Sequence, residues 1–277
     1  MMQYFRLIFR TLGISIVSFI TFCALAVGRG LFFRSGKGYA VWRGFVTRLW
    51  AKSIAKMIGM RITIKGSPPR PPFFLVSNHV SYIDIILLFT QVNAIFVAKG
   101  DLENWPIFNF LIKAGDTIFI DRAQRKDVVR VNRLIREAML KSEGIIIFPE
   151  GTSSSGSDIL LFKPSLFEYP AKNKLPVSYA SIHYRTPECQ TPAYLSVCWW
   201  GTMALEPHFF DLMKVPGFEA TVHFGAEMIP GDNRKLLAQE TYRRIKSIFV
   251  PIVKDVDTGE PEQFTAPFQR SAESERK

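Results

Sequence analysis

The stretch that decides the fold is FFLVSNHVSYIDIILLF, residues 73–89. Its first four residues form an apolar run typical of a buried strand, and the polar residues Asn78 and His79 follow at its end. The segment is apolar again further on, which predicts a short helix over Ile83–Thr90 with Asp84 near its start. A strand, a turn and a helix in this order indicate an α/β domain.

The alternation of strand-like and helix-like runs continues from Arg61 onward. Helices are also predicted over Trp105–Lys113, Lys126–Lys141 and Asn233–Phe249. The other strand-like runs are RITIKG (61–66), AIFVAK (94–99), TIFIDR (117–122), GIIIFPEG (144–151), LPVSYASI (175–182), YLSVCWW (194–200) and ATVHFG (220–225). We therefore expect an α/β fold class, with a mixed, largely parallel sheet covered by helices.

Residues 1–60 are expected to form N-terminal membrane-embedded and interfacial helices, ahead of a domain over 61–250 and a polar, flexible tail over 251–277. Thr11–Gly28 holds 18 residues without a charge. As a helix it would be about 27 Å long, just short of the ~30 Å hydrocarbon core. Cations flank it on both sides, so it either spans the bilayer or enters one leaflet and returns. A cleaved signal peptide ending near Ala24–Ala26 is the competing reading.

The next segment, AVWRGFVTRLWAKSIAKMIGM (40–60), has the period of an amphipathic helix. Its apolar face gathers Trp42, Phe45, Val46, Leu49, Trp50 and Met57. Arg48, Lys52 and Lys56 make a basic stripe along one flank, which Arg43 does not fit. Tryptophans and lysines framing an apolar face suit a helix at a lipid interface. The same pattern also fits a helix packed on its own domain.

The charge balance favours an anionic partner. The 35 Lys and Arg exceed the 24 Asp and Glu, which gives a net charge of +11 and suits nucleic acid, an acidic membrane face or phosphorylated molecules. The three cysteines are odd in number and lack metal-ligand spacing, so a reducing compartment is expected. The sequence contains no P-loop, G-x-S-x-G or zinc pattern, which leaves those chemistries unsupported.

His79 and Asp84 are the first candidate chemical pair. Five residues on a regular helix are 140° out of register, so only a turn between strand and helix could bring the two side chains together. A carboxylate that accepts a hydrogen bond from one imidazole nitrogen makes the other nitrogen more basic, and His79 would then be a general base toward an alcohol. A core histidine satisfied by a nearby carboxylate would have the same sequence.

Two further motifs follow strands. IFIDR ends at Arg122, whose guanidinium could hold a phosphate by two parallel hydrogen bonds or simply pair with Asp121. FPEGT presents Glu150, Gly151 and Thr152 after a strand, where glycine lets a ligand approach the backbone closely. Polar groups at strand ends are where α/β sheets bind ligands.

Together and in this order, NHVSYID, IFIDR, FPEGT and LPVSYA resemble the four signature blocks of the glycerolipid acyltransferase family, whose best-known members are the 1-acyl-glycerol-3-phosphate acyltransferases. The resemblance implies that His79 is the base and Asp84 its orienting partner. It also implies substrate-binding roles, which would fall to Arg122, Lys99, Glu150, Gly151, Thr152 and Pro176. The implied reaction needs no metal and no bound cofactor, with acyl-CoA or acyl-carrier protein as the co-substrate.

The resemblance therefore implies a membrane-associated O-acyltransferase that acylates a lysolipid. The expected acceptor is 1-acyl-glycerol-3-phosphate, and the expected location is the cytoplasmic face of a bacterial inner membrane. Many members have Arg after FPEGT where this chain has SSSG (153–156), and this region resembles a bacterial branch that includes lyso-ornithine-lipid acyltransferases. Lyso-ornithine lipid or another lysophospholipid is thus the alternative acceptor. A catalytically silent membrane-binding protein and a nucleic-acid-binding domain are more distant alternatives, and we expect no nucleic-acid partner.

Overall fold

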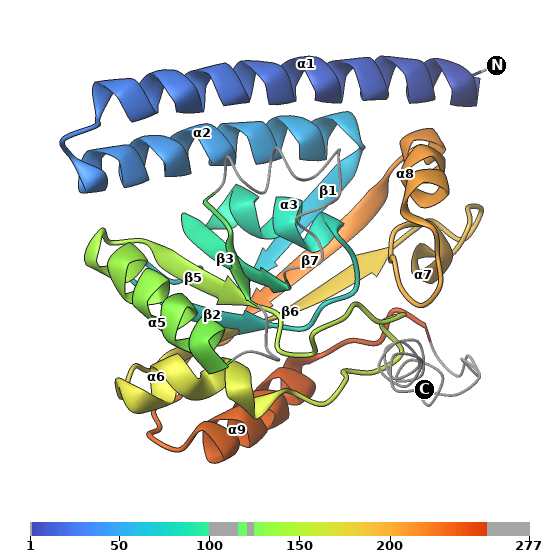
Figure 1. Ribbon diagram of the computed structural model, residues 1–277. Coiled ribbons are helices and arrows are strands. Elements are labelled where there is room, and N and C mark those ends of the chain that lie inside the picture. Colours follow the sequence, from blue (N-terminus) through green and yellow to red (C-terminus); the bar gives the residue numbers. More distant parts are fainter. Residues whose placement is uncertain (1, 100–115, 121–124, 254–277) are drawn as a thin grey trace, which may run out of the picture.

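The computed structural model describes residues 2–99, 116–120 and 125–253 and centres on one seven-stranded sheet (Figure 1). The strands are β1 (Met60–Lys65), β2 (Phe74–Ser77), β3 (Ala94–Lys99), β4 (Ile118–Ile120), β5 (Gly144–Ile147), β6 (Val177–Arg185) and β7 (Phe218–Phe224). Their spatial order is β1-β7-β6-β2-β5-β3-β4. Neighbouring strands run parallel except β6 and β7. The expected mixed, largely parallel sheet is confirmed.

Helices cover both faces of this sheet and enclose two apolar cores (Figure 1). One face carries α2 (Gly36–Met57), α3 (Ile83–Gln91), α7 (Ala193–Ser196) and α8 (Leu205–Lys214). The other carries α5 (Arg125–Leu140), the 3₁₀ turn η2 (Pro164–Phe167), α6 (Glu168–Lys172) and α9 (Arg234–Ile248). Because β2 and β5 are buried on both faces, their sequences are unbroken apolar runs.

Three of the predicted helices, α3, α5 and α9, are confirmed within one or two residues. The predicted helix Trp105–Lys113 lies outside the described residues. The predicted strand over 194–200 is wrong, because the chain there forms α7 followed by irregular backbone. Its tryptophans bond locally instead of facing a sheet: Trp199 Nε1 donates to the Met203 carbonyl at 2.9 Å and Trp200 Nε1 to the Tyr194 carbonyl at 2.8 Å.

The helix α1 (Met2–Leu31) extends the predicted apolar segment at both ends and lies antiparallel to α2 (Figure 1). Trp42 Nε1 donates to the Ala24 carbonyl at 2.9 Å, and Trp50 Nε1 donates to Ser18 Oγ at 3.1 Å. Gly28 permits this approach, since a Cβ there would lie 2.0 Å from the Trp42 ring. The two helices therefore form a tight hairpin beside the sheet domain.

The outer face of this hairpin is apolar and uncovered. Phe5, Phe9 and Phe19 on α1 are between 63% and 70% exposed, and Phe45 on α2 is 63% exposed. α1 is long and apolar enough to cross a membrane, yet only 17% of its most apolar window is buried. It is therefore not an ordinary core helix, and its surface suits lipid.

Arg43 does not belong to the basic stripe of α2 because its side chain is buried. Its side chain is 1% exposed and forms a close ion pair with Glu143, which precedes β5. The same guanidinium lies 3.7 Å from Asp116, before β4. A buried cation needs such partners. The pairs bind α2 to the starts of two strands of the sheet.

Candidate active site

The candidate active site forms where two neighbouring parallel strands end. β2 and β5 are paired with Val76 opposite Ile147, so the segments that follow them leave the same edge of the sheet side by side. The first segment carries His79 and the second carries Glu150. The carboxyl edge of a parallel sheet is where ligands bind in open α/β folds.

The structure brings His79 and Asp84 together through a turn. His79 precedes α3, and Asp84 lies in the first turn of that helix. His79 Nδ1 lies 2.8 Å from Asp84 Oδ2, which also accepts the backbone N–H groups of Val80 at 2.8 Å and Ser81 at 3.0 Å. Asp84 is fully buried. The carboxylate therefore fixes both the fold of the turn and the orientation of the imidazole.

The other carboxylate oxygen of Asp84 accepts a bond from a distant strand. Tyr184 on β6 donates its hydroxyl to Asp84 Oδ1 at 2.8 Å. Burial, together with the charge of Asp84, raises the pKa of Tyr184 well above its usual value. The phenol is therefore a permanent donor at neutral pH, and each oxygen of Asp84 has a hydrogen-bond donor.

The imidazole itself keeps one side available. Its Nδ1 is engaged by Asp84, and no hydrogen bond to its Nε2 is found among the described residues. The side chain is 19% exposed, and its ring stacks on Phe148 with centroids 4.1 Å apart. With the Nδ1 proton held by a carboxylate, Nε2 carries the lone pair. This geometry makes His79 competent as a general base.

Glu150 holds the main chain of His79. Its Oε1 accepts the His79 backbone N–H at 2.7 Å and its Oε2 accepts the Leu160 N–H at 2.8 Å. The Ser154 backbone N–H donates to the His79 carbonyl at 3.0 Å. Burial raises the pKa of Glu150 to about 8, against the effect of the two N–H donors. The loop after β5 thus binds both the N–H and the carbonyl of the His79 main chain.

Two more contacts anchor the turn. The Asn78 side chain accepts the Ile182 N–H at 2.7 Å and donates to the Ile182 carbonyl at 3.0 Å, so its amide continues the ladder to β6 after β2 has ended. The backbone N–H of Trp199 donates to the Val80 carbonyl at 2.9 Å, on the other side of the turn. Asn78 and the segment after α7 were not predicted as parts of the site. The motif contained Asn78, but nothing local indicated its partner 104 residues away.

Only some of the remaining predicted site residues lie near His79. Gly151 has a φ of +78°, which favours glycine, and forms the bend after β5. Thr152 is exposed beside it. Arg122 and the side chain of Lys99 lie outside the described residues. Pro176 is not brought to this group, because the next residue on β6 pairs with the start of β2, at the opposite edge of the sheet.

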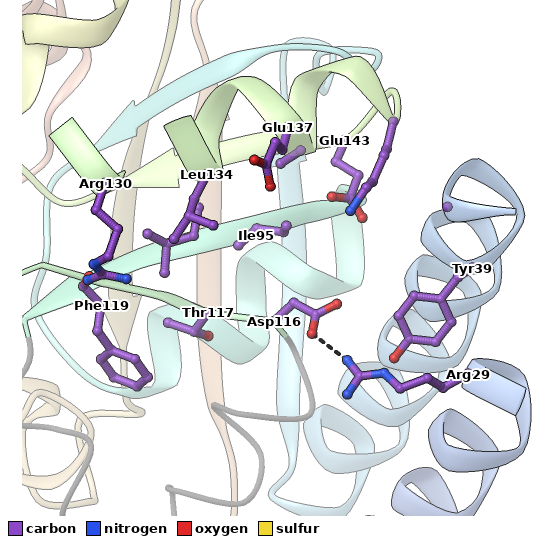
Figure 2. A pocket seen from close by; sticks show the side chains of 14 residues that line it. Arg29, Tyr39, Ile95, Asp116, Thr117, Phe119, Arg130, Leu134, Glu137 and Glu143 are labelled. Carbon is purple, nitrogen blue, oxygen red and sulfur yellow. Dashed lines mark hydrogen bonds and ion pairs between the residues drawn. The ribbon is translucent and has the colours of Figure 1, made fainter. Parts of the chain in front are cut away.

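A pocket of 560 Å³ lies at that opposite, amino edge, between the hairpin and the sheet (Figure 2). Its wall includes part of the amino-edge cluster, by which we mean Arg29, Arg43, Asp116 and Glu143. Arg29 Nη2 lies 2.7 Å from Asp116 Oδ1, the contact drawn in Figure 2. These charges pair with one another and join α1 and α2 to the segments before β4 and β5. The pocket is therefore distinct from the group around His79.

No group of three or more His, Cys, Asp or Glu side chains that could hold a metal occurs within the described ranges. The reactive and orienting groups at the site are the His79 imidazole, the carboxyl groups of Asp84 and Glu150, and the Tyr184 phenol. These residues can orient an imidazole and let it remove a proton from a hydroxyl group.

Comparison with known proteins shows what this chain is similar to. Residues 61–182 match the family model described as Acyltransferase. A lyso-ornithine lipid O-acyltransferase from Rhizobium meliloti (strain 1021) is 29% identical over 228 residues, which cover 74% of this chain and 75% of that protein. A 1-acyl-sn-glycerol-3-phosphate acyltransferase from Neisseria gonorrhoeae is 33% identical over 112 residues, which cover 40% of this chain and 44% of that protein.

The fold also has a solved counterpart. The crystal structure of the 1-acyl-sn-glycerophosphate (LPA) acyltransferase PlsC from Thermotoga maritima matches with a TM-score of 0.61 and 20% identity. The match covers 89% of this chain and 97% of that one. At this identity the likeness establishes a shared fold.

Proposed function

We propose that this chain, an O-acyltransferase whose residues 61–182 belong to the Acyltransferase family, moves a fatty acyl group from a thioester to the free hydroxyl of a lysolipid. The observation that carries the proposal is the contact between the partly exposed His79 and the buried Asp84 at the carboxyl edge of the sheet. A nearby base is what an alcohol needs in order to attack a thioester at neutral pH.

In the proposed reaction, His79 Nε2 removes the proton from the lipid hydroxyl as its oxygen attacks the thioester carbonyl. A C–O ester bond forms and the C–S bond breaks. The leaving thiolate takes the proton from the imidazolium. Asp84 holds the Nδ1 proton throughout and stabilises the transient positive charge on the ring. Acyl-CoA or acyl-carrier protein supplies the thioester.

The leading acceptor in our proposal is lyso-ornithine lipid. The relative with that name aligns over 74% of this chain, whereas the 1-acyl-sn-glycerol-3-phosphate acyltransferase aligns over 40%. The segment after FPEGT is SSSG (153–156), which offers hydroxyls and no cation for a phosphate. 1-Acyl-glycerol-3-phosphate, the acceptor expected from the sequence, is the second candidate, with Arg122 as its phosphate ligand.

We further propose that the hairpin attaches to one leaflet of a membrane, which we expect to be the cytoplasmic face of a bacterial inner membrane. Near its start, the Arg10 guanidinium of α1 donates to the carbonyls of Met213, Val215 and Pro216, at 3.0, 2.5 and 3.2 Å. Near its end, Arg29 binds Asp116. A helix of 30 residues that is fastened to one domain near both ends lies along the membrane and does not cross it.

The test uses purified protein in lipid vesicles with an acyl-CoA or acyl-carrier-protein donor. Lyso-ornithine lipid, 1-acyl-glycerol-3-phosphate and a lysophosphatidylethanolamine are offered separately as acceptors. We expect the highest kcat/KM with lyso-ornithine lipid, and a fall on the order of 10³-fold in His79→Ala. Full activity in folded His79→Ala protein would refute the mechanism. A preference for 1-acyl-glycerol-3-phosphate would instead refute only the acceptor.

A further inference from the structure

We infer that Tyr184 is a positioning residue of the active site, which acts on His79 through the carboxylate of Asp84. This inference rests on the proposed function, because it assigns a role in the same acyl transfer. Tyr184 lies 100 residues from Asp84 in the chain and outside every predicted site motif. It is brought to the carboxylate by the fold alone.

The geometry gives Tyr184 a part that no other described residue duplicates. Asp84 Oδ2 has three donors, from His79, Val80 and Ser81, which all belong to the turn itself. Among the described residues, Asp84 Oδ1 accepts its hydrogen bond from the Tyr184 hydroxyl of a distant strand, at 2.8 Å. The phenol thus helps to fix the rotation of the carboxylate about its Cβ–Cγ bond, from the side opposite the turn. That rotation sets where Oδ2 lies relative to the imidazole.

The packing of Tyr184 makes this donor rigid. The side chain is fully buried, and its ring meets Phe218 edge-on with centroids 5.9 Å apart. Two residues earlier on β6, the backbone of Ile182 holds the Asn78 amide. The strand β6 therefore holds the turn twice, at the Asn78 side chain before His79 and at the Asp84 carboxylate after it.

The phenol also completes the hydrogen bonding of the Asp84 carboxylate. Because both of its oxygens then have donors, the carboxylate stays in place and the imidazole keeps its orientation while Nε2 exchanges protons. Among the described residues, Glu150, the buried Cys198 and His79 also interact with Asp84.

The experiment compares Tyr184→Phe with Tyr179→Phe. Tyr179 is a matched control because it lies buried on the same strand but packs in the core on the other face of the sheet. With the acceptor and donor that wild type uses best, we expect Tyr184→Phe to lower kcat on the order of 10-fold with little change in KM. Tyr179→Phe should leave both parameters within about twofold.

A spectroscopic readout separates positioning from packing. The chain has four histidines, so selective histidine labelling gives few NMR signals and His79→Ala identifies the one that matters. We expect the Nδ1 proton of His79 to change its resonance in Tyr184→Phe and to keep it in Tyr179→Phe. Loss of packing alone would lower the unfolding temperature without this shift.

A second substitution serves in case Tyr184→Phe does not fold. Replacing Tyr184 by 3-fluorotyrosine keeps the ring and makes the phenol a stronger donor, so the Nδ1 resonance should move opposite to its change in the Phe variant. An unchanged Nδ1 resonance and an unchanged kcat in both variants would overturn the inference. An active His79→Ala protein would instead overturn the proposed function, so the two failures can be told apart.

Discussion

Two groups of titratable side chains lie at opposite edges of the same sheet, and each has buried members. The amino-edge cluster pairs the cations Arg29 and Arg43 with the anions Asp116 and Glu143. At the carboxyl edge, the carboxyl groups of Asp84 and Glu150 are also buried, but the donors that surround them are N–H groups, one phenol and one imidazole.

The difference lies in what each group leaves available. In the amino-edge cluster each guanidinium faces a carboxylate, so the cluster fastens the hairpin to the sheet and offers no reactive atom. At the carboxyl edge, one nitrogen of His79 remains accessible while everything behind it is fixed. In this chain, one group of buried charged residues fastens the hairpin to the sheet and the other forms the candidate reaction centre. The accessible titratable side chain of His79 distinguishes the second group from the first.

The largest effect is expected from Asp84→Asn. An amide has only one acceptor oxygen, so its NH₂ group must face either the phenol or the donors of the turn. We expect kcat/KM to fall on the order of 10³-fold, with some loss of stability. Steady-state assays and thermal unfolding measure the two effects. Asp158→Asn, at an exposed carboxylate, is the control and should stay near wild type in both assays.

The amino-edge cluster should respond in the opposite way. Arg43→Met leaves Glu143 buried without its cation, and we expect the free energy of unfolding in urea to fall by about 3–5 kcal/mol. The kcat of the folded fraction should stay within about twofold. The double variant Arg43→Met/Glu143→Leu should recover much of the loss, since it leaves no unpaired charge. A single variant as stable as wild type would contradict the clamp.

Glu150 gives a pH-dependent test at the carboxyl edge. Its folded pKa, about 8, lies above its ordinary value of 4.5. Its contribution to stability is therefore fully present below pH 4.5 and is lost as the pH rises through 8. Between pH 5 and 9 we expect the free energy of unfolding to fall by about 4 kcal/mol more in wild type than in Glu150→Gln. Parallel pH dependences of the two proteins would refute this.

The smallest effect is expected from Arg29→Ala. Arg29 belongs to the same cluster as Arg43, but its side chain is 65% exposed. We expect a loss of less than about 0.5 kcal/mol in the free energy of unfolding, and less at high salt. If Arg29→Ala were as damaging as Arg43→Met, burial could not explain the contrast between the two arginines.

Much of the fold could be predicted because its signals are local. The apolar runs of β2 and β5 and the periodic segments of α3, α5 and α9 each show their secondary structure within a few residues. The segment 194–200 misled because β-branched and aromatic composition favours a strand. The indoles of Trp199 and Trp200 instead donate to carbonyl groups within six residues, after the short helix α7 that Pro192 caps.

The candidate site likewise has one part that local patterns predict and another that depends on the fold. His79, Asp84 and Glu150 stand in recognisable motifs, and the parallel register of two strands brings those motifs together. Tyr184 and the partner of Asn78 depend on where β6 lies in the sheet, which no pattern near His79 encodes. Arg43 could be noticed as an exception to its helix, but only the structure reveals Glu143 as its partner.

The contact between Arg10 and the carbonyls near Met213 has a consequence for biosynthesis. The two partners are 203 residues apart, so the arginine leaves the ribosome long before its acceptors are made. At 5–20 residues per second this interval lasts about 10–40 s. During that time the domain that α1 packs against is incomplete, so we expect the apolar helix to bind a membrane surface. The N-terminal helix would thus bind lipid first, and the sheet domain would fold afterwards beside the membrane.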